Sequence, residues 1–419
     1  MSTILIEFVS VRNEKNSDFE MRGTAMNKMN SLPRERLPEL QLVRAFAIIG
    51  VLSVHSTSYA VSAMTDSKYF FIYNFMNIFM KYGTPTFIFL SSLVLFYNYY
   101  DRPTTKKLIG GFYKKRLLYI IIPYTLFSVF YFGLLHYLHY QGRPFGETME
   151  SFIQKLLTGK AYTHLYFVFI SIQFYVLFPL VLWLFKKMTQ LAKWAIPIGL
   201  VIQWTFILMN KYYWQVPNKG SWALSYIAYF MLGAFIGIYY PKLKTWLVIS
   251  RANAQPYRIA AWTMLWIAWA AAGLGHVYIY YNNRLHGTGY NSTLYELLWN
   301  MHTYFGALVL LQFAILFYRA GVRGWTPALE RLGAVSFGIY LIHPFFLLVY
   351  RQFPLTTGNS ILTHLWYAGG FAAALGCSWI VVELTVRYIP GSWVIFGNIP
   401  KAKRSGKPTD TPAVPLSGS

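Results

Sequence analysis

Acidic residues and cysteine are scarce in this chain of 419 residues. It has 14 Asp and Glu against 37 Lys and Arg, and one cysteine, Cys377. A single cysteine excludes an internal disulfide and a cysteine-ligated metal site. Only Glu383 among the acidic residues lies in a long apolar segment, which disfavours a buried Ser-His-Asp triad or a carboxylate-bridged metal cluster. Acid–base chemistry inside this protein must therefore fall on histidine, tyrosine or Glu383, and we expect no bound metal.

Charge of either sign is also sparse. Charged residues make up 12% of the chain, hydrophobic residues 56%, and the mean hydropathy is +0.37. A soluble domain carries about a quarter charged residues, and repeated apolar stretches of about 20 residues are typical of membrane-spanning helices. The fold class is therefore predicted to be all-α, a polytopic transmembrane helical bundle in the lipid bilayer. The net charge of +23 would suggest nucleic acid as a partner of a soluble protein, but here we expect none, because Lys and Arg collect in cytoplasmic loops.

The apolar pattern predicts about ten spans within a single membrane domain over residues 37–390. Residues 1–36 are predicted to be a disordered cytoplasmic segment and 391–419 a basic cytoplasmic tail. A break or kink is expected in the second span, at Gly83-Thr84-Pro85. Gly233 and Gly237 in the sixth span predict close helix packing. The spans are predicted at 40–62, 70–98, 117–139, 164–185, 195–210, 221–240, 258–282, 301–319, 334–353 and 362–388.

Lysine and arginine predict the orientation of this bundle. With both termini in the cytoplasm, 26 of the 37 basic residues fall in cytoplasmic segments and 9 in outer ones. Such a bias is typical of multi-pass proteins and indicates that both ends of the chain lie in the cytoplasm. The cell membrane is the expected location.

Arg44 and His55 are ionisable residues within the first predicted span. Such residues are costly in hydrocarbon and indicate function by default. Eleven residues make just over three helical turns, so both side chains share one face, roughly 16 Å apart along the axis. His55 has the pKa of a general base near neutrality. Two simpler roles stay open: an interhelical hydrogen bond for His55, and contact with cytoplasmic headgroups for Arg44.

Three further groups of polar residues stand out. Ser336, Tyr340 and His343 share one face of the ninth span, which favours either a wet cavity or interhelical hydrogen bonds. The basic cluster at the start of the third span fits either an anchor to acidic lipid or a clamp for a phosphate-bearing donor. Glu383 either orients a base or pairs with Arg387 one turn later, and we favour the pair. The basic cluster consists of Lys114, Lys115 and Arg116.

Several of these motifs, in this order, resemble the acyltransferase 3 family of integral membrane proteins over about residues 37–390. The resemblance extends to the branch that contains the intercellular adhesion protein C and polysaccharide O-acyltransferases. Two departures are Tyr119, where the family often has a second arginine, and Tyr166, where it usually has tryptophan. The matching segments are Arg44-x10-His55, Gly83-Thr84-Pro85 with Ser91-Ser92, Lys115-Arg116 with Pro123-Tyr124, His164-Leu-Tyr166-Phe167 and Ser336-Phe-Gly-Ile-Tyr340-Leu-Ile-His343.

The resemblance implies an enzyme that transfers an acyl group, usually acetyl, from cytoplasmic acyl-coenzyme A to a hydroxyl of a cell-surface or exopolysaccharide carbohydrate. It implies His55 as general base or acyl carrier, with Arg44 binding phosphate or stabilising the oxyanion. Other membrane proteins of polysaccharide synthesis are possible partners. The alternative is a polysaccharide exporter without acyl-transfer chemistry. The donor would be bound by Lys114, Lys115 and Arg116, and the acceptor by Ser91, His164, Tyr340 and His343.

Overall fold

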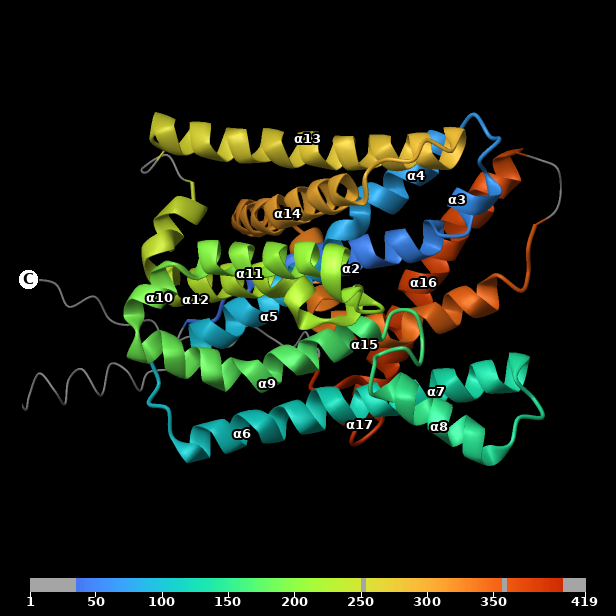
Figure 1. Cartoon of the computed structure of the whole chain (residues 1–419), viewed down its shortest axis with the longest axis horizontal. Coiled ribbons are helices and arrows are strands. Elements are labelled where there is room, and N and C mark those ends of the chain that lie inside the picture. Colours follow the sequence, from blue (N-terminus) through green and yellow to red (C-terminus); the bar gives the residue numbers. More distant parts are fainter. Residues whose placement is uncertain (1–34, 250–253, 356–359, 402–419) are drawn as a thin grey trace, which may run out of the picture.

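The computed structural model describes residues 35–249, 254–355 and 360–401, and within these ranges it contains helices and no strand (Figure 1). The all-α prediction is therefore confirmed. The helices are α2 (Glu39–Thr57), α3 (Ala60–Ala63), α4 (Phe70–Phe79), η1 (Met80–Tyr82), α5 (Gly83–Tyr99), α6 (Lys106–Arg116), η2 (Leu117–Ile121), α7 (Ile122–His139), α8 (Phe145–Leu156), α9 (Tyr166–Lys187), α10 (Thr189–Lys193), α11 (Ala195–Met209), η3 (Asn210–Trp214), η4 (Lys219–Ser221), η5 (Ala223–Tyr226), α12 (Ile227–Leu247), α13 (Pro256–His286), α14 (Ser292–Ala320), α15 (Trp325–Tyr350), α16 (Ser360–Tyr388) and α17 (Trp393–Phe396).

Nine helices in the described ranges are long and apolar enough to cross a membrane. The fifth predicted span, 195–210, is the one that these nine leave out; it corresponds to α11, which has 15 residues and is shorter than the roughly 20 that a bilayer requires. The π-helical turn η3 extends this helix by 5 residues. α11 packs along α12 within the bundle. The protein is thus a multi-pass membrane protein whose fifth predicted span is short.

Both described ends of the chain lie at the same end of the bundle. At the N-terminal side, the backbone carbonyl of Glu35 accepts a hydrogen bond of 3.1 Å from Tyr97, near the end of α5. At the C-terminal side, Arg331 near the start of α15 donates to the carbonyl of Pro400 at 2.5 Å. The start of α15 lies against the start of α2, where a Cβ on Gly333 would come within 1.8 Å of the Gln41 carbonyl. We call this end of the bundle the near end and the opposite one the far end.

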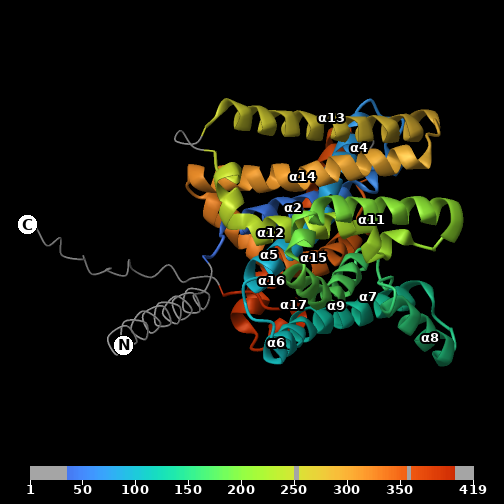
Figure 2. The ribbon, with the colours of Figure 1, turned by 60° about the vertical axis from the view of Figure 1, so that its left-hand side comes forward.

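Helix α2, which carries Arg44 and His55, lies in the middle of the bundle. It contacts α4, α5, α14, α15 and α16. Figures 1 and 2 both place it between α14 and α15, with α13 at the edge. Two charged or titratable side chains therefore occupy a central helix of the fold, where each must meet protein or a cavity rather than lipid.

The packing of α5 on α12 confirms the predicted small-residue pair. A Cβ on Gly233 would lie 2.3 Å from the Phe89 carbonyl, and one on Gly237 would lie 2.5 Å from the Leu93 carbonyl. Only glycine allows the two backbones to approach this closely. The predicted break in the second span is also confirmed, because a 3₁₀ turn, η1, separates α4 from α5 immediately before Gly83.

The third span contains an irregularity next to its basic cluster. Helix α6 ends at Arg116, and one π-helical turn, η2, joins it to α7, which has Pro123 in its first turn. Proline has no N–H to donate, so the carbonyl of Tyr119, four residues earlier, lacks its helical partner. Gly397 lies against this carbonyl, with a φ of 71°. The first residues of the predicted tail thereby pack on the third span through α17, whereas residues 1–34 and 402–419 lie outside the described ranges.

Candidate active site

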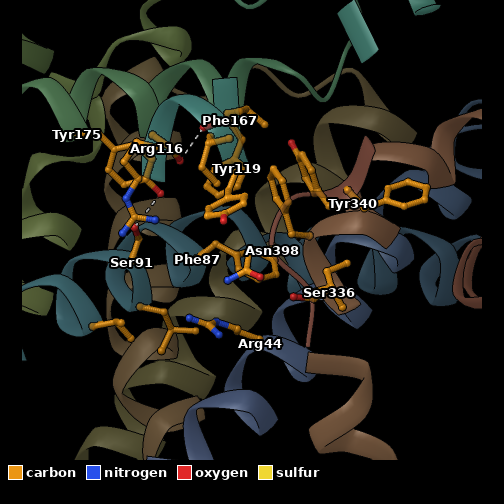
Figure 3. Close-up of a pocket in the computed structure, with 18 of the residues that line it drawn as sticks. Arg44, Phe87, Ser91, Arg116, Tyr119, Phe167, Tyr175, Ser336, Tyr340 and Asn398 are labelled. Carbon is orange, nitrogen blue, oxygen red and sulfur yellow. Dashed lines mark hydrogen bonds between the residues drawn. The ribbon is translucent and has the colours of Figure 1, made fainter. Parts of the chain in front are cut away.

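A cavity of about 440 Å³ opens among the helices near the basic cluster. Arg44, Lys115 and Arg116 line it, and none of its lining residues is acidic. In Figure 3, Arg44 and Arg116 approach the cavity from opposite sides. Among the described residues no carboxylate pairs with these three cations, which leaves N–H donors available for an anionic ligand. We call this space the basic cavity.

Aromatic rings hold Arg116 in place. Its guanidinium carbon lies 4.6 Å from the ring centroid of Tyr175 and 5.3 Å from that of Phe112. The Tyr175 hydroxyl lies 3.2 Å from the hydroxyl of Ser91, so these two groups bind each other beside the arginine (Figure 3). The Arg116 Nε is buried without a hydrogen-bond partner in the described part of the chain. This arginine is therefore oriented by stacking while part of its hydrogen-bonding capacity is unused.

The predicted donor residues divide into two groups. Lys115 and Arg116 line the basic cavity, whereas Lys114 is exposed and does not. Arg44 lines the cavity and donates a hydrogen bond of 3.2 Å to the side chain of Gln41. The cavity therefore combines the basic start of the third span with the arginine of the first, which are far apart in the sequence.

Tyr340 and Phe167 border the cavity on the side of the histidines. Their rings pack edge to face with centroids 5.2 Å apart. The Tyr340 hydroxyl donates to the backbone carbonyl of His164. Ser336, from the same predicted stripe as Tyr340, also lines the cavity, but its hydroxyl binds the carbonyl of Gly333 at 2.8 Å. The predicted polar stripe thus faces a cavity, and its third member, His343, lies behind Tyr340.

Backbone carbonyls fix the orientation of two fully buried histidines. Nδ1 of His343 lies 2.9 Å from the carbonyl of Tyr340, and Nε2 of His164 lies 3.2 Å from that of Leu341. A carbonyl only accepts, so each facing ring nitrogen carries the proton in the neutral ring. The remaining nitrogens, Nε2 of His343 and Nδ1 of His164, are buried without a hydrogen-bond partner in the described residues. Each of these histidines therefore presents a free lone pair, which is what a base or nucleophile requires.

His55 completes this group from α2. Its ring centroid lies 5.2 Å from that of His343, and His343 lies 5.6 Å from His164. Arg351, just after α15, donates a hydrogen bond of 2.7 Å to the backbone carbonyl of His55 and one of 3.2 Å to the hydroxyl of Ser58. We call His55, His164, His343 and Tyr340 the histidine layer.

Arg44 and His55 therefore occupy different levels of the bundle. Arg44 lines the basic cavity near the near end, while His55 lies beyond Tyr340 toward Arg351 at the far end. The predicted acceptor residues are likewise divided, because Ser91 and Tyr340 line the basic cavity and His164 and His343 do not.

Several residues of the site have no motif that predicts them. Tyr175, Ser171 and Asn398 line the cavity, and Asn398 comes from the segment predicted as tail. Gly391 and Gly397 are the turn signals that precede it, both with positive φ. In the sequence, Arg351 stands out only as one of the basic residues assigned to outer segments. One specific expectation is wrong: Glu383 pairs with Arg331 at 2.5 Å rather than with Arg387, because α15 brings a bidentate arginine partner beside it.

Comparison with known proteins bears on this arrangement. The family described as "Acyltransferase domain" (Acyl_transf_3) matches residues 37–383. The chain belongs to this acyltransferase family. The matched range includes the histidine layer, the basic cluster and most of the cavity, and the resemblance seen in the sequence is thereby confirmed.

Several curated proteins that are similar in sequence carry names that refer to a polysaccharide. A Staphylococcus epidermidis protein named "Probable poly-beta-1,6-N-acetyl-D-glucosamine export protein" is 25% identical over 323 residues, which is 74% of this chain and 81% of the relative. A Staphylococcus aureus (strain MRSA252) protein of the same name is 25% identical over 283 residues, 64% of this chain and 69% of the relative. No solved structure matches this chain with significance. The protein is therefore an acyltransferase-family membrane protein related to proteins of polysaccharide processing.

Proposed function

We propose that this protein is a membrane O-acyltransferase of the cell membrane that moves an acyl group, acetyl in the first instance, from cytoplasmic acyl-coenzyme A to a carbohydrate hydroxyl. The observation that carries the proposal is the basic cavity bordered by the histidine layer. A cavity of about 440 Å³ lies within the range of small-molecule sites, roughly 300–1,000 Å³. The acceptor would be a cell-surface or exopolysaccharide carbohydrate, made in concert with other membrane proteins of polysaccharide synthesis.

The chemistry of the cavity supports an acyl-coenzyme A donor. Coenzyme A carries phosphate groups, which guanidinium and ammonium donors bind strongly where no carboxylate competes. Arg116 and Lys115 would bind these phosphates at the cavity entrance. The acyl end would then point toward Tyr340 and the histidines behind it.

The histidine layer supports the transfer step. In our proposal a histidine lone pair removes the proton of the acceptor hydroxyl, and the oxygen attacks the thioester carbonyl. The carbon–sulfur bond then breaks, and coenzyme A leaves as a thiol that takes up the proton. Arg44 lines the basic cavity together with Arg116 and would bind a phosphate of the donor there. His55 is our first choice for the base or transient acyl carrier, with His343 beside it at 5.2 Å between ring centroids.

Export of polysaccharide is the second candidate, and the names of the relatives favour it. An exporter needs a continuous polar path between the two ends of the bundle. In this structure the basic cavity meets Tyr340, whose hydroxyl binds the carbonyl of His164 and whose ring packs on Phe167. That closure agrees better with a reaction chamber for small groups than with a conduit for a glycan chain.

The deciding experiment compares ester-linked acyl groups on surface glycans in wild type, a deletion strain and a His55→Ala strain with a normal protein level. Acyl transfer predicts that ester is lost in both mutants while total glycan persists. Unchanged ester per sugar with reduced surface glycan would overturn the enzyme proposal and favour export.

A further inference from the structure

A second hollow lies on the other side of the histidine layer. It has a volume of about 510 Å³ and is lined by residues that immediately precede α9 and by the loop before α12. The basic cavity follows α9 from Phe167 to Tyr175, whereas the second hollow reaches only Tyr166 at the start of this helix. The two spaces therefore flank the same short segment, which contains His164. The hollow's lining residues are Gly159, Lys160, Tyr162, Thr163, Tyr166, Asn218, Gly220, Ser221 and Tyr226.

Tyr162 presents a flat aromatic wall to this hollow. One face of its ring stacks on Tyr131, with centroids 4.4 Å apart and an interplanar angle of 22°. Its ring also meets His164 edge to face at 5.7 Å. Tyr131 in turn donates to the carbonyl of Leu341 at 2.9 Å, the carbonyl that also faces His164. The ring of Tyr162 is thus held rigidly beside the histidine layer while it lines the hollow.

The opposite wall is a loop in an unusual and well-anchored conformation. Asn218 has a φ of 56°, a left-handed conformation that asparagine adopts more readily than most other non-glycine residues. Gln173 in α9 holds the loop through hydrogen bonds to the carbonyl of Ser221 at 2.8 Å and from the N–H of Ala223 at 3.0 Å. Lys219 pairs with Glu296 of α14 at 2.5 Å.

The side chain of Asn218 is exposed and makes no hydrogen bond within the described part of the chain, although it lines the hollow. A free carboxamide beside the hollow, on a loop that Gln173 and Lys219 hold in place, fits a binding role.

We propose that this hollow is the saccharide subsite of the protein, with Tyr162 as stacking platform and Asn218 as hydrogen-bonding partner of a sugar hydroxyl. The inference rests on the proposed function and extends it to named acceptor residues. Sugar C–H groups pack on the electron-rich face of an aromatic ring, and hydroxyls need polar partners beside it. The donor and the acceptor then approach the histidine layer from opposite sides, and the glycan has no need to enter the basic cavity.

The chain offers a matched pair of variants for the test. Asn218→Gly removes the carboxamide while glycine accepts the left-handed backbone without strain. Gln215→Gly makes the same backbone change at the other non-glycine residue that has a positive φ within the described ranges, and Gln215 does not line the hollow. Tyr162→Leu removes the platform while keeping an apolar side chain against Tyr131.

Binding to the purified full-length protein in nanodiscs is measured by calorimetry with three tetrasaccharides: β-1,6-linked N-acetylglucosamine, its deacetylated form and oligogalacturonate. We expect wild type to bind at least one of the three tetrasaccharides, and Gln215→Gly to bind it with the same Kd. Asn218→Gly should weaken Kd about fivefold, which corresponds to one lost hydrogen bond, and Tyr162→Leu about tenfold. Coenzyme A affinity should be the same in all four proteins.

Failure of the subsite and failure of the enzyme proposal give different results. Equal saccharide affinity of Asn218→Gly and Gln215→Gly, or no binding of any tetrasaccharide by wild type, would overturn the subsite. If Asn218→Gly shows the expected fivefold weaker Kd but the wild-type protein transfers no acyl group, the subsite is supported and the enzyme proposal is overturned.

Discussion

Two pairs of buried histidines can be compared within the described residues, and one of them packs against a ring that lines the basic cavity. His164 and His343 lie behind Tyr340, which lines the basic cavity. His276 of α13 and His302 of α14 have ring centroids 5.8 Å apart and are 1% and 0% exposed. Neither residue of this second pair lines the basic cavity or the second hollow. Burial of a histidine in a membrane bundle is therefore common to both pairs and does not distinguish them.

The difference lies in orientation and access. The rings of His164 and His343 are each fixed by a backbone carbonyl and keep one free nitrogen. Both ring nitrogens of His302 lack a partner within the described residues, and its ring packs against Phe79 at 4.9 Å. A base needs a defined tautomer and a route for its substrate, whereas an unsatisfied buried ring only lowers stability. We therefore assign chemistry to the histidine layer and packing to the second pair.

The largest effect is expected at His55. His55→Ala should lower acyl transfer by a factor of about 10² to 10⁴, the usual contribution of a general base. Transfer is measured with radiolabelled acetyl-coenzyme A and an oligosaccharide acceptor, at equal amounts of purified protein. His276→Ala is the matched control from the second pair. Activity of His55→Ala within twofold of the control would remove His55 from the mechanism.

Arg116 tests the donor side of the layer. Arg116→Lys keeps the charge but loses the planar group that stacks on Tyr175, and Arg116→Ala loses both. We expect the KM for acyl-coenzyme A to rise about tenfold in the lysine variant and further in the alanine variant, with a smaller change in the acceptor KM. A rise confined to the acceptor KM would contradict the assignment of this cavity to the donor.

The neighbouring residues Lys114 and Lys115 give a second test of donor binding in the basic cavity. Lys115 lines the basic cavity and Lys114 does not, although both are exposed. Lys115→Ala should raise the KM for acyl-coenzyme A a few-fold at low salt, an effect that fades as salt screens the charge. Lys114→Ala should leave it unchanged. Equal effects of both substitutions would indicate a general attraction by the basic cluster instead of a defined clamp.

The smallest functional effect is expected at His302. His302→Leu removes two unsatisfied nitrogens at the price of some packing, so we expect unchanged acyl transfer and an equal or higher stability, by about 1 kcal/mol. Thermal unfolding of the purified protein in detergent measures the second quantity. A large loss of activity in a variant that remains folded would show that the second pair shares in the chemistry.

The sequence predicts the helical bundle well because long apolar segments leave a bilayer protein few alternatives. It also predicts the break before Gly83 and the close contact at Gly233 and Gly237, since glycine and proline act locally. Helix ends are less predictable. α15 begins at Trp325, where the prediction began at 334, because the helix continues beyond its apolar part.

The site is predicted as a set of residues but not as an arrangement. Arg44 and His55 share a helix, and only the packing of α15 beside α2 reveals that His343 lies with His55 and not with Arg44. The ion pair of Glu383 with Arg331 joins residues 52 positions apart, which no local spacing rule can predict. Asn398 enters the cavity because Gly397 packs on the third span, a contact between distant segments.

The most direct test of the account replaces one histidine in each pair by glutamine, as His343→Gln and His302→Gln, in the purified full-length protein. Transfer of labelled acetyl groups to an oligosaccharide is measured at saturating donor, with coenzyme A binding as the check on folding. The account predicts that His343→Gln loses at least about 10² in transfer rate while His302→Gln keeps the wild-type rate. Equal rates in the two variants would contradict the assignment of the chemistry to the histidine layer.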